Sequence, residues 1–99
     1  MAVAGESSST MLEQEITVSN KLGLHARASA KLVQRLHGFR SQVWLVHGAR
    51  EVNAKSIMGV MMLAAGIGTP LIIRADGDDE TEAVQAVAEL FERKFDEGA

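Results

Sequence analysis

The chain of 99 residues contains no cysteine, and this absence excludes two kinds of structure. Without thiols the chain has neither a disulfide framework nor a thiolate metal site. No apolar run approaches the length of a membrane span, so we expect no insertion into a membrane. With 46% apolar residues, the chain is long enough for one folded domain around one hydrophobic core.

An excess of positive charge is also missing, and this bears on the expected partners. The 13 acidic residues outnumber the 10 lysines and arginines, which gives a net charge of -3. Nucleic-acid binders are usually basic, so nucleic acid is not an expected partner. Residues 1–10 lack the basic start and apolar centre of a signal peptide, and we expect a cytoplasmic protein. They are small and polar after Val3, which predicts a flexible N-terminal extension before a domain at residues 11–99.

Patterns typical of metal, nucleotide or hydrolytic sites are absent as well. His25, His37 and His47 do not have the spacing of a metal-ligand set, and His37 is better explained as a cation at a helix end. Gly66 and Gly68 are not followed by the Lys-Ser or Lys-Thr of a phosphate-binding loop. No Ser/His/Asp arrangement is visible. We therefore predict no metal site and no cofactor.

Hydrophobic periodicity divides the sequence into strands and helices. The strand pattern occurs at residues 12–19, 42–47, 50–53 and 71–76, and helical spacing occurs at residues 26–37, 56–65 and 80–95. The order is β-α-β-β-α-β-α, and the alternating strands indicate a sheet with one wet face. The sequence therefore predicts an α+β fold, an open-faced β-sandwich in which three helices cover one face of a four-stranded antiparallel sheet.

The second predicted strand should divide its side chains between core and solvent. We expect Val43 and Leu45 to point inward, which places Trp44 on the open, partly exposed face. Gly48 and Ala49 are predicted to form the tip of a hairpin with the next strand.

The last predicted helix begins among acidic residues. Asp79 with Glu82 fits a capping box, in which both side chains bond to free backbone N–H groups. An acidic start also suits the positive end of the helix dipole. We therefore interpret these carboxylates as helix-capping groups rather than metal ligands.

A histidine stands where the first predicted helix begins. The start of a helix favours Ser, Thr, Asp or Asn, so His25 breaks a local rule, and such breaks point to functional sites. Neutral imidazole is a nucleophile, and the free N–H groups of a helix start favour an anion. Arg27 adds charged donors for phosphate oxygens. These features predict a residue that carries a phosphoryl group; the alternative is a surface histidine beside a solvated arginine.

The predicted helix at residues 56–65 has no polar face. Ile57, Met58 and Met61 are part of an apolar surface that runs round it, and Ser56 is placed to be its N-cap. A domain of this size can hardly surround a helix. The methionines are therefore either adaptable contacts for partner proteins or fillers of gaps in the core.

Two motifs in this sequence resemble those of a known family. Gly-Leu-His-Ala-Arg at residues 23–27 resembles the active-site motif of HPr, the histidine-containing phosphocarrier protein of the bacterial phosphoenolpyruvate:sugar phosphotransferase system. Asn-Ala-Lys-Ser-Ile-Met-Gly-Val-Met at residues 53–61 resembles the family's second signature, around a regulatory serine. The order of elements and the turn at residues 75–77 also match. The resemblance covers about residues 11–98.

The resemblance implies a carrier in sugar transport rather than a stand-alone enzyme. In the family, the histidine takes a phosphoryl group from enzyme I, which is charged by phosphoenolpyruvate, and passes it to an enzyme IIA. His25 is the matching position, with a phosphohistidine expected at Nδ1, and Arg27 would neutralise the phosphate. Ser56 matches the serine that HPr kinase/phosphorylase modifies in members that have this regulator.

The resemblance also implies a docking surface for enzyme I. Lys31 and Lys55 would supply positive charge to it, beside the apolar side chains of Ile57, Met58 and Met61. Phosphate on Ser56 would place negative charge next to this surface and hinder docking. We expect the carrier to be a monomer.

One position departs from the family pattern. Proline usually follows the arginine, where its fixed φ suits the first helical turn, but here the residue is Ala28. Alanine is compatible with a helix, so we expect the site to survive with a looser helix start. Two alternatives stay open: a regulatory interaction module of a nitrogen-related phosphotransferase branch or kinase-controlled circuit, and a small-ligand-binding domain. The sequence shows no lining for a ligand pocket.

Overall fold

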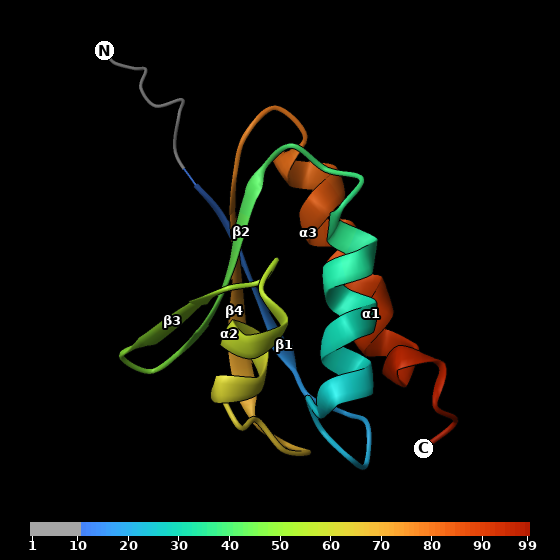
Figure 1. Cartoon of the computed structure of the whole chain (residues 1–99). Helices are drawn as coiled ribbons and strands as arrows, with labels where there is room; N and C mark the ends of the chain where they lie inside the picture. Colours follow the sequence, from blue (N-terminus) through green and yellow to red (C-terminus); the bar gives the residue numbers. More distant parts are fainter. Residues whose placement is uncertain (1–10) are drawn as a thin grey trace.

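The computed structural model describes residues 11–99 as a sheet with helices packed against it (Figure 1). Its elements are β1 (Leu12–Thr17), α1 (Ala26–Leu36), β2 (Gln42–His47), β3 (Arg50–Asn53), α2 (Ile57–Met62), β4 (Pro70–Asp76), α3 (Glu80–Glu92) and a short 3-10 helix, η1 (Lys94–Asp96). The predicted order β-α-β-β-α-β-α is confirmed. The predicted N-terminal extension, residues 1–10, lies outside the described residues.

The four strands form one antiparallel sheet in the order β1-β4-β2-β3. His47 pairs with Arg50, so Gly48 and Ala49 form the predicted two-residue hairpin tip. Gly48 has a φ of 61°, a left-handed conformation that glycine adopts at little cost. Pro70, which cannot donate a ladder hydrogen bond, is the first residue of β4.

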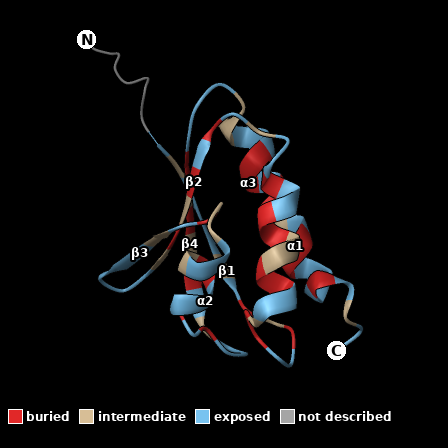
Figure 2. Ribbon diagram, viewed as in Figure 1, coloured by how far each residue is buried: buried red, intermediate tan, exposed pale blue. Residues whose placement is uncertain are grey.

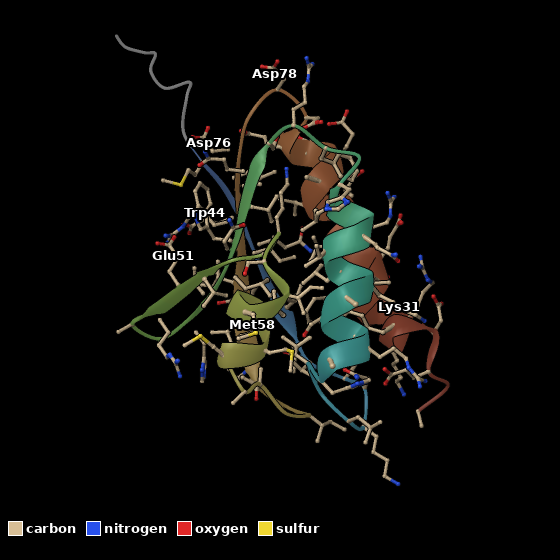
Figure 3. All side chains as sticks on the ribbon, in the orientation of Figure 1. Lys31, Trp44, Glu51, Met58, Asp76 and Asp78 are labelled. Carbon is tan, nitrogen blue, oxygen red and sulfur yellow. The ribbon has the colours of Figure 1, made fainter. Side chains whose placement is uncertain are left out.

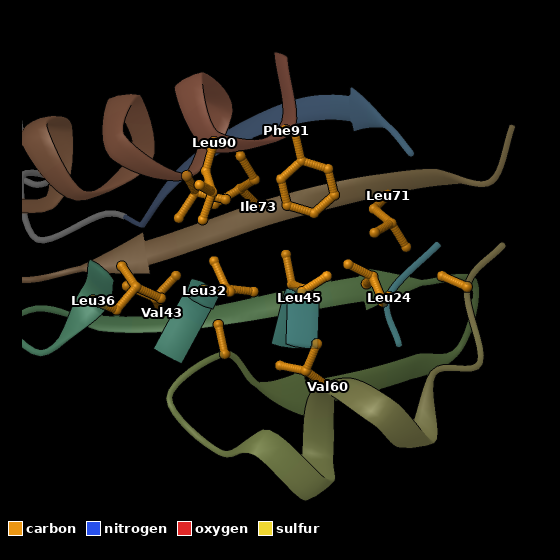
Figure 4. Packing of buried hydrophobic residues seen from close by; sticks show 14 of the residues in the cluster. Leu24, Leu32, Leu36, Val43, Leu45, Val60, Leu71, Ile73, Leu90 and Phe91 are labelled. Carbon is orange, nitrogen blue, oxygen red and sulfur yellow. The ribbon is translucent and has the colours of Figure 1, made fainter. Parts of the chain in front are cut away.

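The hydrophobic core lies between one face of the sheet and the helices (Figures 2 and 4). Val43 and Leu45 of β2 are buried in it, whereas Trp44 between them is half-buried on the other face, as predicted. On that open face Arg74 lies between two carboxylates, 2.7 Å from Glu13 and 2.7 Å from Glu51. The open-faced sandwich predicted from strand alternation is therefore the fold that the chain adopts.

Two predicted helices are shorter than their periodicity suggested. The second helix ends at Met62, and Ala64 beyond it has a φ of 52°. The third ends at Glu92 instead of Phe95, because the chain then turns through left-handed backbone at residues 94–96. This turn buries Phe95 completely, with its ring centroid 4.9 Å from that of Phe91.

The predicted capping box at the start of α3 is wrong. Asp79 is the N-cap residue, but its side chain makes no bond to its own helix. Its carboxylate instead accepts hydrogen bonds from the backbone N–H groups of Arg40 and Ser41, both at 2.9 Å, and from the Ser41 hydroxyl at 2.5 Å. These bonds, the Ser41 hydroxyl first, lower the pKa of Asp79 to about 2.

A different carboxylate caps the turn before α3. Glu80, not Glu82, accepts a hydrogen bond from the Gly77 N–H at 3.1 Å. The loop after α1 thus competes successfully for Asp79, which a pattern within one segment cannot reveal. Among residues 11–99, no helix is both long enough and apolar enough to cross a membrane.

Candidate functional site

His25 is the N-cap residue of α1. Its backbone is extended (φ -74°, ψ -179°), and its Nδ1 accepts a hydrogen bond from the Arg27 N–H at 3.3 Å. A ring nitrogen thus does what a Ser or Asp oxygen does at most helix starts. His25 is unusual as an N-cap residue, but it still provides an acceptor for a free N–H group of the first turn. Its Nδ1 therefore faces the N-terminal end of α1.

The loop that delivers His25 to this position requires a glycine. Gly23 has a φ of 70°, and a Cβ atom there would lie 2.5 Å from the carbonyl oxygen of Ala65. The next residue, Leu24, donates its N–H to that same oxygen at 2.9 Å. Gly23 and Leu24, the two residues before His25, are therefore held against the segment that follows α2.

The opposite side of the imidazole ring meets a carboxylate. His25 Nε2 lies 2.5 Å from Glu97 Oε2, and Glu97 Oε1 accepts from Asn20 Nδ2 at 3.0 Å. The Asn20 amide, followed by the hydrogen bond and charge of His25, lowers the pKa of Glu97 below its ordinary value, so the group is ionised at neutral pH. A carboxylate only accepts hydrogen bonds, so Nε2 carries the proton and Nδ1 of the neutral ring keeps its lone pair.

The His25 side chain is 28% exposed and lies in an open hollow. Arg27, also exposed, has no ion pair within residues 11–99, so its guanidinium can bind an incoming anion. Lys31, one turn further on, donates to the Phe95 carbonyl at 2.7 Å and lies 3.9 Å from Asp96. The hollow is lined by Leu22, His25, Ala26, Arg27, Lys31, Asp96 and Glu97.

Glu97 is the residue of this site that the sequence did not reveal. It is separated from His25 by 72 positions, and it belongs to no motif near the histidine. The C-terminal segment returns to the start of α1 only because of the turn after α3 (Figure 1). The sole local signal is that Glu97 follows the predicted third helix closely.

The second motif places a serine and several apolar side chains on α2. Ser56 is the N-cap as predicted, and its Oγ accepts from the Gly59 N–H at 3.0 Å. Ile57, Met58 and Met61 are 42%, 70% and 39% exposed, so these side chains lie on the surface rather than filling the core. Figure 3 shows Met58 on α2 and Lys31 on α1.

Further large apolar side chains are exposed in residues 11–99. Met62, Leu22 and Ile67 are 61%, 68% and 62% exposed. Lys55, which we expected to supply charge to the surface, donates its ammonium group to the Phe39 carbonyl at 2.8 Å. Its charge is thus partly engaged by the loop after α1.

Ala28, the departure from the family pattern, is accommodated without distortion. The residue is completely buried in the first turn of α1, and the helix begins regularly at Ala26. The following residue, Ser29, donates its N–H to the His25 carbonyl at 2.9 Å. The helix start is therefore intact in the absence of proline. Within residues 11–99, no group of three or more His, Cys, Asp or Glu side chains could hold a metal ion.

Comparison with known proteins gives a consistent result. The family described as PTS HPr component phosphorylation site matches residues 12–93. A phosphocarrier protein HPr of Xylella fastidiosa (strain Temecula1) is 62% identical over 87 residues, which are 88% of this chain and 98% of that protein. A phosphocarrier protein NPr of Shewanella violacea is 38% identical over 90 residues, 91% of this chain and 99% of that protein.

A solved structure supports the same assignment. The crystal structure of HPr-C-His from Thermoanaerobacter tengcongensis superimposes with a TM-score of 0.83 at 46% identity, covering 87% of this chain and 97% of that one. The fold and the histidine at a helix N-terminus define a small phosphocarrier domain. The chain belongs to the HPr family, the phosphocarrier proteins of the phosphotransferase system. The resemblance inferred from its two motifs is confirmed.

Proposed function

We propose that His25 accepts a phosphoryl group on Nδ1 from enzyme I, which derives it from phosphoenolpyruvate, and passes it to enzyme IIA-type acceptors. The observation that carries the proposal is the state of the ring, with Nε2 held by Glu97 and the lone pair left on Nδ1. A lone pair directed at the helix start is the nucleophile that such a transfer needs.

The surroundings of Nδ1 suit the charge that arrives. A phosphoryl group brings nearly two negative charges, and a helix N-terminus favours an anion. In the unmodified protein, the Arg27 N–H donates a hydrogen bond to Nδ1. When Nδ1 forms a bond to phosphorus, this N–H becomes free to donate to a phosphoryl oxygen instead. The Arg27 guanidinium can add charged hydrogen bonds. With 28% of the His25 side chain exposed, a partner protein can reach the group, and no deep pocket traps it.

Incubation with enzyme I and phosphoenolpyruvate tests this proposal. We expect an acid-labile adduct of one phosphoryl group on the wild-type chain and none on His25→Ala. His47→Ala, which changes an exposed histidine at the β2–β3 hairpin, is the matched control and should be modified like the wild type. A wild-type chain that stays unmodified would remove the proposal.

We further propose that the apolar surface of α2, with Arg27, Lys31 and Lys55 near it, docks enzyme I. Ser56 is then a regulatory phosphorylation site for HPr kinase/phosphorylase where that enzyme is present. In support, Ser56 lies at the α2 N-terminus and is followed by exposed Ile57 and Met58. The carrier is proposed to act as a cytoplasmic monomer.

A second candidate function is regulatory. One curated relative, 38% identical, is named phosphocarrier protein NPr, and we propose as the alternative a regulatory carrier in a nitrogen-related branch, in which sugar uptake is secondary. The chemistry at His25 is the same in both cases, so the acceptor decides between them. Rapid flow of phosphate from His25 to a sugar through an enzyme II would contradict the regulatory alternative.

A further inference from the structure

We propose that the outer edge of β1, with α3 beside it, is a docking groove to which a basic, extended segment of a partner protein adds as a further strand. β1 is the first strand in the order β1-β4-β2-β3, so within residues 11–99 it pairs with β4 alone. None of the residues that line the groove lines the hollow at His25. The proposal therefore does not depend on the function proposed for His25.

Half of the backbone groups of β1 point to this open edge. Val18, directly after the strand, donates its N–H to the Thr69 carbonyl at 3.0 Å, and its carbonyl accepts from the Gly68 N–H at 2.7 Å. Hydrogen bonds alternate along an antiparallel pair, so every second residue from Val18 back to Leu12 faces β4. The N–H and C=O groups of the residues between them are therefore directed away from the sheet; these residues are Glu13, Glu15 and Thr17.

β1 lacks the features that usually protect the edge of a sheet. Its six residues pair with β4 in an unbroken register, so no bulge twists the edge away. It contains neither proline nor lysine. The opposite edge strand, β3, has only four residues and includes Arg50. β1 is therefore the edge at which strand addition is expected.

Helix α3 forms the second wall of the groove. Glu15 and Ile16 of β1 line it together with Ala88, Glu89 and Glu92 of α3. Ile16 and Ala88 are half-buried and pack against the core, so they provide an apolar floor. An added strand would direct alternate side chains toward this floor and the others toward the open face of the sheet.

The charges along the groove select a basic partner. Glu15, Glu89 and Glu92 are exposed and form no ion pair within residues 11–99, and the lining of the groove includes no lysine or arginine. Glu13, which lies on the same face of β1 as Glu15, adds a carboxylate that it shares with Arg74. Basic side chains opposite Glu13 and Glu15 would form cross-strand pairs with them.

The same charges disfavour a copy of this chain as the occupant. A second β1, paired antiparallel at its centre, would place glutamates opposite glutamates, which destabilises a sheet. Residues 1–10 of a second copy contain Glu6 and no lysine or arginine, so they carry no basic side chain for the groove. The occupant that fits is a segment that alternates basic and apolar residues and pairs antiparallel, as all strands of this sheet do.

A short capped peptide of alternating lysine and valine, added to the full chain, is the probe for this groove. Hydrogen exchange at the N–H groups of Glu13, Glu15 and Thr17 should slow when the peptide binds. Exchange along β3, the other edge of the sheet, should stay unchanged and is the internal control.

Reversing one charge of the groove tests its selectivity. In Glu15→Lys, the affinity for the lysine peptide should fall about fivefold, the upper range for an exposed ion pair, and a peptide of alternating glutamate and valine should bind more tightly than it does to the wild type. Asp78→Lys makes the same charge change outside the groove, at a carboxylate that is 85% exposed. This matched control should bind like the wild type, and circular dichroism checks that both variants fold.

Two methylated peptides distinguish strand addition from simple attraction between charges. In an antiparallel pair, the lysines opposite Glu13 and Glu15 exchange backbone hydrogen bonds with them, while the valine N–H groups point away from β1. Methylation of the backbone nitrogens of the lysines should therefore weaken binding about tenfold or more, because several hydrogen bonds are lost. Methylation of the backbone nitrogens of the valines should weaken it much less.

Several outcomes would overturn the proposal. A wild-type chain that does not bind the lysine peptide has no such groove. Equal binding of the two methylated peptides would show that charge alone attracts them, and unchanged affinity in Glu15→Lys would place the binding elsewhere. Slow exchange at Glu13, Glu15 and Thr17 before any peptide is added would mean that the chain itself or a second copy already covers the edge.

Discussion

A single imidazole has two different tasks at its two nitrogens. Nδ1 caps the first turn of α1 by accepting from Arg27, and Nε2 is held by Glu97. An aspartate in place of His25 would cap the helix equally well but would offer no nitrogen nucleophile. In the proposed transfer this geometry makes Nδ1 the reacting nitrogen, and the residue that seemed out of place in the sequence satisfies the requirement for a helix cap.

Gly23 is the residue that we expect to tolerate substitution least in the loop before His25. In Gly23→Ala, the φ of 70° becomes unfavourable and the new Cβ meets the Ala65 carbonyl oxygen at 2.5 Å. The left-handed conformation alone costs an L-residue about 1–2 kcal/mol, so we expect a loss of about 2 kcal/mol or more in unfolding free energy. Urea unfolding followed by circular dichroism measures it.

Gly38→Ala is the matched control for that experiment. A Cβ at Gly38 would meet nothing within 4 Å, so this variant should unfold within about 0.5 kcal/mol of the wild type. Equal stability of both variants would show that the loop before His25 accommodates a side chain at position 23. It would contradict the conclusion that this loop is held rigidly against Ala65 and fixes the position of His25.

At the scale of elements, α2 combines a capping serine with an exposed apolar surface. Val60 faces the core and is completely buried, while Met58 on the outer side is 70% exposed. A six-residue helix with so little buried surface depends on its cap and on its neighbours more than on its own propensity. Charge added at Ser56 can therefore alter the surface without removing the cap.

Ser56→Asp should weaken enzyme I binding while leaving the fold intact. An aspartate is an acceptable N-cap, so we expect the melting temperature to change little. Its negative charge next to exposed Ile57 and Met58 should lower the affinity several-fold, because an unpaired charge must be desolvated on docking. Calorimetric titration with enzyme I measures the affinity.

Ser56→Asn, a neutral N-cap of similar shape, is the control and should bind more tightly than Ser56→Asp. Unchanged affinity in Ser56→Asp would mean that α2 is not the docking surface.

The whole fold was more predictable than the site, for a physical reason. Strand alternation depends on residues two positions apart, so the inward direction of Val43 and Leu45 could be predicted. The position of Glu97 depends on a turn through left-handed backbone at residues without glycine, which sequence preferences argue against. This turn carries Phe95, whose ring is completely buried in the core, so contacts with distant segments support it. Contacts of this kind join segments that are far apart in the sequence, and the pattern within one segment does not predict them.

The capping box at α3 was predicted wrongly for the same reason, because a distant loop binds Asp79. This contact also leads to a prediction for the stability of the whole molecule. Asp79 joins the loop after α1 to the start of α3 through hydrogen bonds from Arg40 and Ser41. These bonds favour the ionised carboxylate and lower its pKa from 3.8 to about 2. A lowered pKa in the folded state means that the folded protein binds the proton less tightly than the unfolded chain does. The contribution of Asp79 to stability is therefore complete above about pH 4 and is lost as the pH falls towards 2.

Asp79→Asn tests this linkage. At pH 7 the variant should melt at a lower temperature than the wild type, because an amide places two donors where three donors already point at the side chain. As the pH falls from 4 to 2, the wild type should lose this advantage and the two melting temperatures should converge. Asp78→Asn is the control: its carboxylate is 85% exposed and lies 3.6 Å from Arg40, so its effect should be small at every pH. A gap between wild type and Asp79→Asn that stays constant down to pH 2 would show that the ionised carboxylate does not hold the loop to α3.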